Sequence, residues 1–299
     1  MAGILVLGDA LLDVHATPRE PMRPGGDVPA DVRLGVGGQG ANVAVRLARR
    51  GRSVRLACAV GDDVAAPLVR DALYRAGVSV VPMPARATGS VVILLDAAGE
   101  RTMLSDRVPF ASAAAARLPE LAPAADWIVV SGYLLEEPRQ PLAAAAMGSA
   151  RRMLVGCPFR DADAWRAGLL ALAPDLLVLN RREAASLVDL PPDRSPAELA
   201  TTLAPLTEGT TVVVTDGAGV AAATGTDPAI ETATPAGDGV IDTTGAGDAF
   251  AATLLAEVHA AWPPSAEALR AAMVRAGTVA SQVARVVGAQ TPVPAEETA

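Results

Sequence analysis

Short runs of β-branched and other apolar residues alternate along this chain with alanine-rich stretches, and this alternation limits the possible folds most. Six such runs are typical of β-strands, and several are apolar at consecutive positions: ILVLGD, VRLACAVGDD, WIVVSG, MLVGCP, DLLVLN and TVVVTDG. Strands that are apolar on both faces belong to sheets that helices cover on each side. The pattern therefore predicts a doubly wound α/β fold.

The stretches between these runs have the marks of helices. ANVAVRLARRG and PLVRDALYRAG carry apolar residues three and four positions apart, and they stop at Gly51 and Gly77. We expect a single domain over residues 1–299, with helices on both faces of the sheet. Residues 14–34, rich in proline and glycine, and residues 88–104, which read as a hairpin, do not fit that pattern. We expect them to form a small β lid.

Composition excludes several classes of protein. The 299 residues are 51% hydrophobic and 19% charged, which favours a large buried core over a disordered chain. A formal net charge of -8, without blocks of like charge, predicts a small-molecule substrate and no nucleic-acid or membrane partner. Asp9 and Asp13 interrupt the apolar start, which is too short for a signal peptide or a membrane span. We therefore expect a cytoplasmic protein.

The chain offers few or no lysine, cysteine or histidine side chains for covalent catalysis or metal binding. The chain has no lysine, which excludes a lysine Schiff base and the lysine of a phosphate-binding P-loop. Cys58 and Cys157 lack a C-x-x-C partner and are interpreted as buried thiols. His15 and His259 are isolated in the sequence, so no zinc site can be assembled from them.

Gly35, Gly37 and Gly40 have the G-x-G-x-x-G spacing of dinucleotide-binding turns. That fingerprint needs a strand directly before the first glycine and an acidic residue about 20 residues later. Only VRL precedes Gly35, although Asp62 and Asp63 do follow the next strand. A nicotinamide- or flavin-dependent oxidoreductase is therefore kept only as an alternative, which stabilisation by NAD(H) or by ATP would test.

A second glycine cluster, in DTTGAGDAF, begins a predicted helix. Gly245, Ala246 and Gly247 leave backbone N–H groups free to face an anion at the positive end of that helix. Asp248 follows in the first turn, where a carboxylate repels phosphate but can accept the proton of an attacking hydroxyl. A glycine-rich helix start with an N-terminal charge is the alternative interpretation.

Taken together, GGQGANVAV and DTTGAGDAF resemble the two motifs of the ribokinase or PfkB family of carbohydrate kinases. The resemblance continues in order along the chain through GDALLD, GDD, GERT, NRRE, TDG and GAQTPVP. It implies a ribokinase-like fold and an enzyme that uses ATP and Mg²⁺ to phosphorylate a primary hydroxyl of a pentose, ketohexose or sugar acid. A nucleoside kinase, or a homologue that binds its ligand and catalyses weakly, remains the alternative.

The resemblance assigns residues to an acceptor site and a catalytic site. Five match the family's sugar-binding positions: Asp13, Gly37, Gly38, Asn42 and Glu136. Glu137, beside the last of these, leaves its register open. Asp248 would be the general base, and the run Gly245, Ala246 and Gly247 would be the anion hole.

Further matches fall on the nucleotide and metal positions of the family. Asn180, Thr215 and Gly217 match nucleotide contacts, and Glu183 matches a residue that holds Mg²⁺ through water. A lone N-x-x-E is also what a helix cap requires. Asp242 and Thr244 belong to the loop that holds a monovalent cation, such as K⁺, in ribokinase relatives.

Several positions depart from the ribokinase pattern. Gln39 stands where ribokinase has lysine and Leu11 where it has asparagine, and both changes remove polar reach toward a sugar. Pro292 replaces a serine ligand of the cation, so K⁺ activation is left open. Arg101, in GERT, is either an exposed hairpin residue or a substrate contact.

The lid also predicts a homodimer. A two-stranded ribbon cannot by itself bury the apolar run SVVILL, and in ribokinase-like relatives two lids clasp each other. The alternative is that Val91, Ile93 and Leu95 pack onto the parent domain as one strand face.

Overall fold

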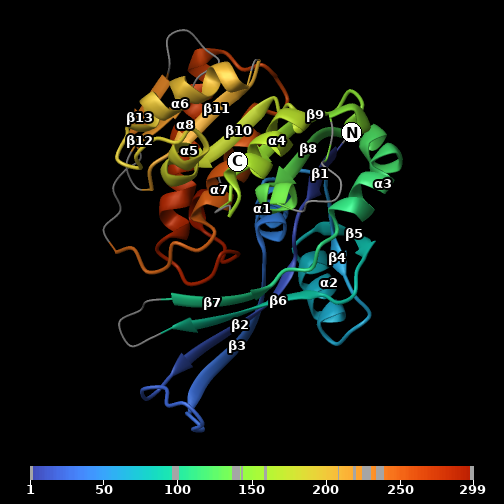
Figure 1. Ribbon diagram of the computed structural model, residues 1–299, viewed down its shortest axis with the longest axis vertical. Coiled ribbons are helices and arrows are strands. Elements are labelled where there is room, and N and C mark those ends of the chain that lie inside the picture. Colours follow the sequence, from blue (N-terminus) through green and yellow to red (C-terminus); the bar gives the residue numbers. More distant parts are fainter. Residues whose placement is uncertain are drawn as a thin grey trace.

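The computed structural model describes residues 3–95, 101–136, 142, 144–157, 160–207, 209–217, 220–223, 230–233 and 239–296. Figure 1 shows a large sheet flanked by helices and a smaller sheet that projects from one side of it. No helix in these ranges combines the length and apolar character that crossing a membrane requires.

The strands of the large sheet lie in the order β13-β12-β11-β10-β9-β8-β1-β4-β5. In chain order they are β1 (Gly3–Leu7), β4 (Val54–Val60), β5 (Val78–Pro84), β8 (Ala125–Ser131), β9 (Arg151–Val155), β10 (Leu176–Asn180), β11 (Thr211–Thr215), β12 (Val220–Ala223) and β13 (Ile230–Ala233). The seven strands from β11 to β5 are parallel, and β12 and β13 continue the sheet antiparallel. All six runs that the sequence marked as strands lie in the parallel part.

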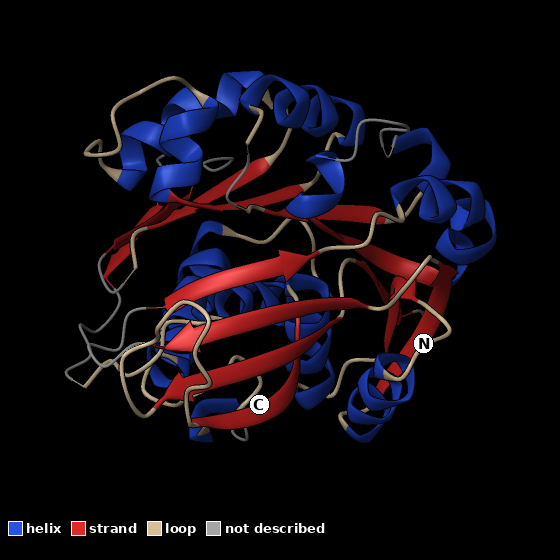
Figure 2. Ribbon diagram, turned by 60° about the horizontal axis from the view of Figure 1, so that its bottom comes forward, coloured by secondary structure: helices blue, strands red, loops and turns tan. Residues whose placement is uncertain are grey.

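Helices cover both faces of this sheet (Figure 2). They are α1 (Gln39–Arg49), α2 (Ala65–Arg75), α3 (Ala111–Leu121), α4 (Ala162–Leu172), α5 (Arg181–Leu187), α6 (Pro196–Leu203), α7 (Ala246–Val258) and α8 (Ala266–Val283). One core contains side chains of α1, α2, α7 and α8, and the other contains side chains of α3 to α6. Along β1, Ile4 and Val6 enter the first core, whereas Leu5 and Leu7 enter the second. This alternation explains the apolar runs and confirms the doubly wound three-layer fold.

Glycine ends the first two helices, as their sequences predicted. Gly51 follows α1 with φ 72°, and Gly77 follows α2 with φ 81°. Both residues occupy the left-handed region that favours glycine after a helix.

The smaller sheet, called here the lid sheet, has the strand order β3-β2-β6-β7. It consists of β2 (Leu11–Pro18), β3 (Ala30–Gly37), β6 (Gly89–Leu95) and β7 (Arg101–Asp106). The segments 14–34 and 88–104 fall on it, while the expected turn at 97–99 lies outside the described residues. Leu11, Val91 and Ile93 form a buried cluster on one face of this sheet.

Residues 284–296, called here the post-α8 segment, run back to α1. There the Arg46 side chain, which is 0% exposed, forms an ion pair of 2.6 Å with Glu296. The same guanidinium donates hydrogen bonds to the carbonyl oxygens of Ala289 and Thr291, at 2.5 and 3.1 Å. One buried arginine of α1 thus holds the post-α8 segment at three points.

This ion pair predicts a large effect on stability. Glu296→Ala leaves the buried Arg46 charge without its partner, and we expect the free energy of unfolding to fall by about 3–5 kcal/mol. Urea denaturation followed by circular dichroism measures the change. The control is Asp31→Ala, which breaks the exposed pair of Arg19 and Asp31 and is expected to change stability little, because water screens that pair. Equal effects of the two variants would contradict the prediction.

Candidate active site

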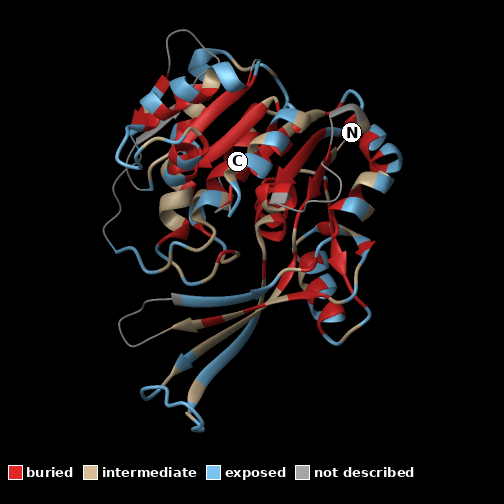
Figure 3. Ribbon diagram, in the orientation of Figure 1, coloured by how far each residue is buried: buried red, intermediate tan, exposed pale blue. Residues whose placement is uncertain are grey.

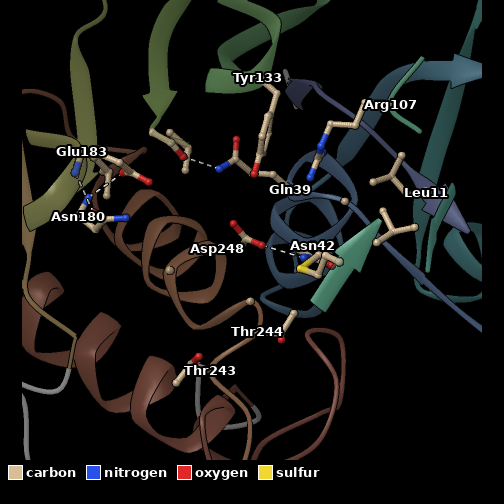
Figure 4. A pocket seen from close by; sticks show the side chains of 18 of the residues that line it. Leu11, Gln39, Asn42, Arg107, Tyr133, Asn180, Glu183, Thr243, Thr244 and Asp248 are labelled. Carbon is tan, nitrogen blue, oxygen red and sulfur yellow. Dashed lines mark hydrogen bonds between the residues drawn. The ribbon is translucent and has the colours of Figure 1, made fainter. Parts of the chain in front are cut away.

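A cavity of about 370 Å³ lies where the lid sheet faces the carboxyl ends of the parallel strands. The lid sheet contributes Leu11, Asp13, Val91, Ile93 and Met103, and the strand ends contribute Val155, Gly156, Asn180 and Thr215. The starts of α1 and α7 complete it, and Figure 4 shows their side chains pointing into the same space. Ligands of open α/β sheets bind at this edge of the sheet.

Most of the site residues expected from the sequence line this cavity: Asp13, Gly38, Asn42, Asn180, Glu183, Thr215, Thr244, Gly245, Gly247 and Asp248. Gly37, Ala246, Gly217 and Asp242 lie beside it in the chain without lining it. Glu136 ends the short 3-10 helix η2 (Gly132–Glu136), and its side chain lies outside the described part of the structure, as does that of Arg101.

The first glycine cluster joins the lid sheet to α1 by a very close backbone approach. A Cβ on Gly40 would lie 2.6 Å from the Cα of Gly8, and one on Gly38, where φ is 96°, would lie 2.7 Å from the Asp9 carbonyl oxygen. A Cβ on Gly37 would overlap the Asp13 carboxylate. Because an antiparallel lid strand precedes this turn, it is not the first turn of a dinucleotide-binding βαβ unit.

Asp13 presents a carboxylate to the cavity from β2. Burial, with a smaller contribution from the nearby Asp9, raises its pKa to about 6 against the opposing positive charge of Arg107. An ionised carboxylate only accepts hydrogen bonds, which suits the hydroxyl groups of an acceptor substrate.

Arg107 and Tyr133 also line the cavity, although no sequence motif indicated either residue. Arg107 is paired with Asp9, and its guanidinium lies 3.7 Å from the centroid of the Tyr133 ring. Asp9 in turn accepts a hydrogen bond from the backbone N–H of Gly40, at 3.2 Å. This ion pair fixes the Arg107 guanidinium at the cavity, with its charge balanced by Asp9.

Asp248 lies in the first turn of α7, opposite α1. Its Oδ2 accepts a hydrogen bond of 2.7 Å from the Asn42 amide, as Figure 4 shows. Burial raises the pKa of Asp248 to about 7, although the Asn42 hydrogen bond works in the opposite direction. A general base is most effective when its pKa lies near the working pH. The Asn42 amide, expected to face a sugar, thus donates to this carboxylate.

The start of α7 is shaped by a contact with the post-α8 segment. Gly245 has φ 77°, and a Cβ there would lie 2.8 Å from the Cα of Ala289. Gly245 and Gly247 line the cavity without a side chain, and the Ala246 N–H between them donates to the Thr243 carbonyl oxygen at 3.3 Å. The first N–H groups of a helix lack intrahelical acceptors, so this end can hold an anion.

Asn180 and Glu183 form a capping box at the start of α5. The Glu183 N–H donates to the Asn180 side chain at 3.0 Å, and the Asn180 N–H donates to the Glu183 carboxylate at 2.9 Å. Glu183 is buried beside the cavity, and burial raises its pKa to about 7. Asn180 and Glu183 therefore cap α5 and line the cavity at the same time.

The remaining expected residues lie on two loops. The Thr215 hydroxyl donates to the Leu179 carbonyl oxygen at 3.4 Å, and Gly217 follows with φ 54°, where a Cβ would have no atom of the described residues within 4 Å. The Asp242 carboxylate accepts hydrogen bonds from the backbone and hydroxyl of Thr244 and from the backbone N–H of Gly288. Asp242 thus links the loop before α7 to the post-α8 segment.

Gln39 has a role that its sequence position did not reveal. Its Nε2 donates to the Gly156 carbonyl oxygen at 2.6 Å, and its Oε1 accepts from the Ser131 hydroxyl and the Gly132 N–H. The side chain therefore ties the start of α1 to the ends of β8 and β9. The sequence suggested only a loss of polar reach at this position.

Comparisons with known proteins agree over nearly the whole chain. The model of the pfkB family carbohydrate kinases matches residues 1–296. A fructokinase of Salmonella typhimurium is 33% identical over 314 aligned positions, covering 98% of this chain and 96% of that protein. A ribokinase structure from Thermotoga maritima superposes with a TM-score of 0.79 at 19% identity, covering 99% and 97% of the two chains. A carbohydrate kinase from Agrobacterium tumefaciens gives a TM-score of 0.75 at 26% identity, covering 97% and 92%.

The raised pKa of Asp248 predicts how stability depends on pH. Between the ordinary value of 3.8 and about 7, the folded protein holds this proton more tightly than the unfolded chain does. Stability therefore falls as the pH rises through this window. We expect Asp248→Asn to raise the Tm at pH 8 by about 2 °C or more, and to raise it less at pH 5.

Differential scanning fluorimetry at the two pH values measures this effect. The exposed Asp193→Asn serves as the control, since it removes one carboxylate without touching the cavity. If Asp248→Asn raised the Tm equally at pH 5 and pH 8, the loss of stability at high pH would not come from ionisation of Asp248.

Proposed function

The chain belongs to the pfkB family of carbohydrate kinases, and we propose that it transfers the γ-phosphoryl group of ATP to a primary hydroxyl of a sugar, with Asp248 as general base. One observation carries the proposal above the others. The Asp248 carboxylate, seen in Figure 4, enters the cavity beside Gly245 and Gly247, which line the same space at the start of α7. The proposed base, Asp248, and the proposed anion-binding end of α7 thus lie within the same helical turn.

Each group has a task in the transfer. As the acceptor oxygen forms its bond to the γ-phosphorus, Asp248 accepts the hydroxyl proton, and the bond from phosphorus to the leaving ADP oxygen breaks. The backbone amides of Gly247 and Asp248 stabilise the charge on the transferring group, while that of Ala246 donates to the Thr243 carbonyl oxygen. The transition state is largely dissociative, so a weakly basic carboxylate suffices.

The nucleotide side of the cavity suits a Mg²⁺–ATP complex. Among the described residues no three His, Cys, Asp or Glu side chains gather closely enough to hold a metal directly. Glu183 is a buried carboxylate with an elevated pKa, and a nearby cation would favour its ionised form. We therefore assign Asn180 and Glu183 to Mg²⁺ through water, and Thr215 and Gly217 to the nucleotide. Bound Mg²⁺ supplies charge neutralisation of the phosphates.

A monovalent cation remains a prediction for the loop of Asp242 and Thr244. In its favour, this carboxylate links the loop before α7 to the post-α8 segment, both of which shape the anion site. Activity measured in K⁺, Na⁺ and tetramethylammonium salts at equal ionic strength tests it.

Acceptor recognition is assigned to Asp13 and the glycine turn that precedes α1. The wall beside Asp13, on the same face of the lid sheet, consists of Leu11, Val91 and Ile93, whose side chains offer no hydrogen bonds. This wall suits the C–H face of a sugar, and it also favours the second candidate function, phosphorylation of a nucleoside. Release of ADP with a panel of pentoses, hexoses, sugar acids and nucleosides separates the two.

The outer face of the lid sheet supports the proposal of a homodimer. Strand register places Leu34, Val14, Val92 and Leu104 opposite one another in a row across all four strands. Leu34 and Leu104 are 62% and 59% exposed, and Figure 3 shows exposed surface on both edge strands. A row of this length on one open face resembles an interface more than scattered surface residues. Two lid sheets related by a twofold axis would cover it.

The first functional prediction concerns the general base. Asp248→Asn should lower kcat by roughly 10²–10⁴, because a positioned base is lost, while the affinity for ATP measured by calorimetry stays nearly unchanged. Asp13→Ala is the contrasting variant. It should raise the KM for the acceptor by at least about tenfold, since charge-assisted hydrogen bonds of about 1.5–3 kcal/mol are removed. Retention of kcat by Asp248→Asn would rule out the base.

A second prediction concerns the lid. The double variant Val92→Asp and Leu94→Asp places charges on the outer face, so a dimer should dissociate and its affinity for the acceptor should fall. Light scattering coupled to size exclusion measures the mass. Val64→Asp, at an 89% exposed position on the start of α2, is the matched control. A native protein that is already monomeric, with activity unaltered by the double variant, would reject the dimer.

A further inference from the structure

A chain of three side chains connects the post-α8 segment to Asp248. Gln290 Nε2 donates to Asn42 Oδ1 at 3.1 Å, and Asn42 Nδ2 donates to Asp248 Oδ2 at 2.7 Å. The three residues come from separate parts of the chain, and Asn42 between them is 5% exposed. The Asn42 amide therefore has a fixed partner on each side.

The direction of this chain follows from which groups can donate. An ionised carboxylate can only accept, so Asn42 must turn its NH₂ group toward Asp248 and its carbonyl oxygen away. The neighbour on the carbonyl side must then be a donor, and the Gln290 amide supplies one. If that neighbour could not donate, the Asn42 oxygen would be a buried acceptor without a partner.

Arg46 fixes the backbone on both sides of Gln290. Arg46 donates to the carbonyl oxygens of Ala289 and Thr291, the residues on either side of Gln290. This guanidinium is itself fixed by its ion pair with Glu296. The position of the Gln290 side chain is thus set by a rigid, buried anchor.

We propose that Gln290 is a positioning residue for the phosphoryl transfer, which orients the Asn42 amide so that one oxygen of Asp248 is held and the other is presented to the acceptor hydroxyl. The inference rests on the proposed role of Asp248 as the base. Gln290 acts only through Asn42, since the cavity lining contains Asn42 but not Gln290.

Orientation of Asn42 also affects the proton affinity of the base. The Asn42 hydrogen bond lowers the pKa of Asp248, against the upward effect of burial. Other charged or titratable groups act on Asp248 electrostatically: Asp9, Arg46, Arg107, Glu183 and Tyr133. Replacing Gln290 leaves all five of these groups in the protein. Loss of the Asn42 hydrogen bond should therefore raise the pKa of the base and move the acid limb of the kcat/KM profile to higher pH.

The test uses two variants of Gln290 in the full chain. Gln290→Glu has nearly the same shape, but its ionised carboxylate competes with Asp248 for the single NH₂ group of Asn42. We expect kcat to fall roughly 10- to 100-fold, as for a misplaced catalytic group, with the acid limb at higher pH and the KM for ATP unchanged. Gln290→Met removes the donor without adding charge, and it should shift the acid limb in the same direction by a smaller amount.

Gln282→Met is the matched control. The Gln282 side chain accepts a hydrogen bond from the Ala295 N–H, so this variant also weakens the post-α8 segment but leaves Asn42 untouched. We expect it to lower the Tm without moving the acid limb. Equal shifts in Gln282→Met and Gln290→Met would mean that Gln290 is only structural, and would overturn the proposal.

The outcomes separate this inference from the proposed function. If Asp248→Asn is inactive while both Gln290 variants keep the native kcat and acid limb, Asp248 remains the base and the role of Gln290 is refuted. If Asp248→Asn keeps its kcat, the proposed base itself fails. If Gln290→Met does not fold, the polar Gln290→Glu, at a half-buried position, decides the question alone.

Discussion

The contact between the backbones of Gly8 and Gly40 is the constraint on which the rest of the site depends. It brings the start of α1 against the end of β1, with no room for a side chain at Gly40. Two residues later, Asn42 then faces the first turn of α7 and reaches Asp248. Just before Gly40, Gln39 can bond to the ends of β8 and β9. A larger residue at this crossing would move α1 and separate all of these groups.

The cavity gathers three carboxyl groups whose surroundings favour the neutral form. Burial raises the pKa of Asp13 to about 6 and those of Glu183 and Asp248 to about 7. Such groups reduce stability at neutral pH, and a core built for stability alone would replace them with apolar side chains. They make chemical sense when a substrate hydroxyl, a phosphate and a metal ion enter the same space. This conflict between stability and chemistry is a physical argument that the cavity is functional.

Much of the fold could be predicted from the sequence, because it depends on local pattern. The six strand runs and the glycine stops of α1 and α2 follow from side-chain periodicity and from positive φ. Strand ends of a parallel sheet share one edge, so Asn180 and Thr215 could be expected near each other. The short antiparallel strands β12 and β13 carry no comparable pattern and were missed. The extent of the lid sheet was also missed, because its pairing joins segments far apart in the chain.

Side-chain partners in the site could not be predicted in the same way. Arg107 and Tyr133 stand alone in the sequence, and only tertiary packing brings them together. Asn42 was expected to contact the acceptor, and it does line the cavity, but nothing in a linear motif shows that its NH₂ group bonds to a residue 206 positions away. Glycine motifs mark where backbones approach closely, whereas hydrogen-bond partners depend on which side chains that approach leaves facing each other.

The post-α8 segment shows how distant parts of the chain become one site. Three of its contacts reach residues in or beside the cavity: Gly288 bonds to Asp242, Ala289 packs against Gly245, and Gln290 bonds to Asn42. These contacts are consecutive in sequence, so a shift of the post-α8 segment would displace the loop before α7, the turn at Gly245 and Asn42 together. Arg46 opposes such a shift because it holds the carbonyl oxygens of Ala289 and Thr291, the residues on either side of Gln290. A single buried cation in α1, lying one helical turn after Asn42, therefore couples the geometry of Asp248, the proposed base, to that of the proposed anion site at Gly245.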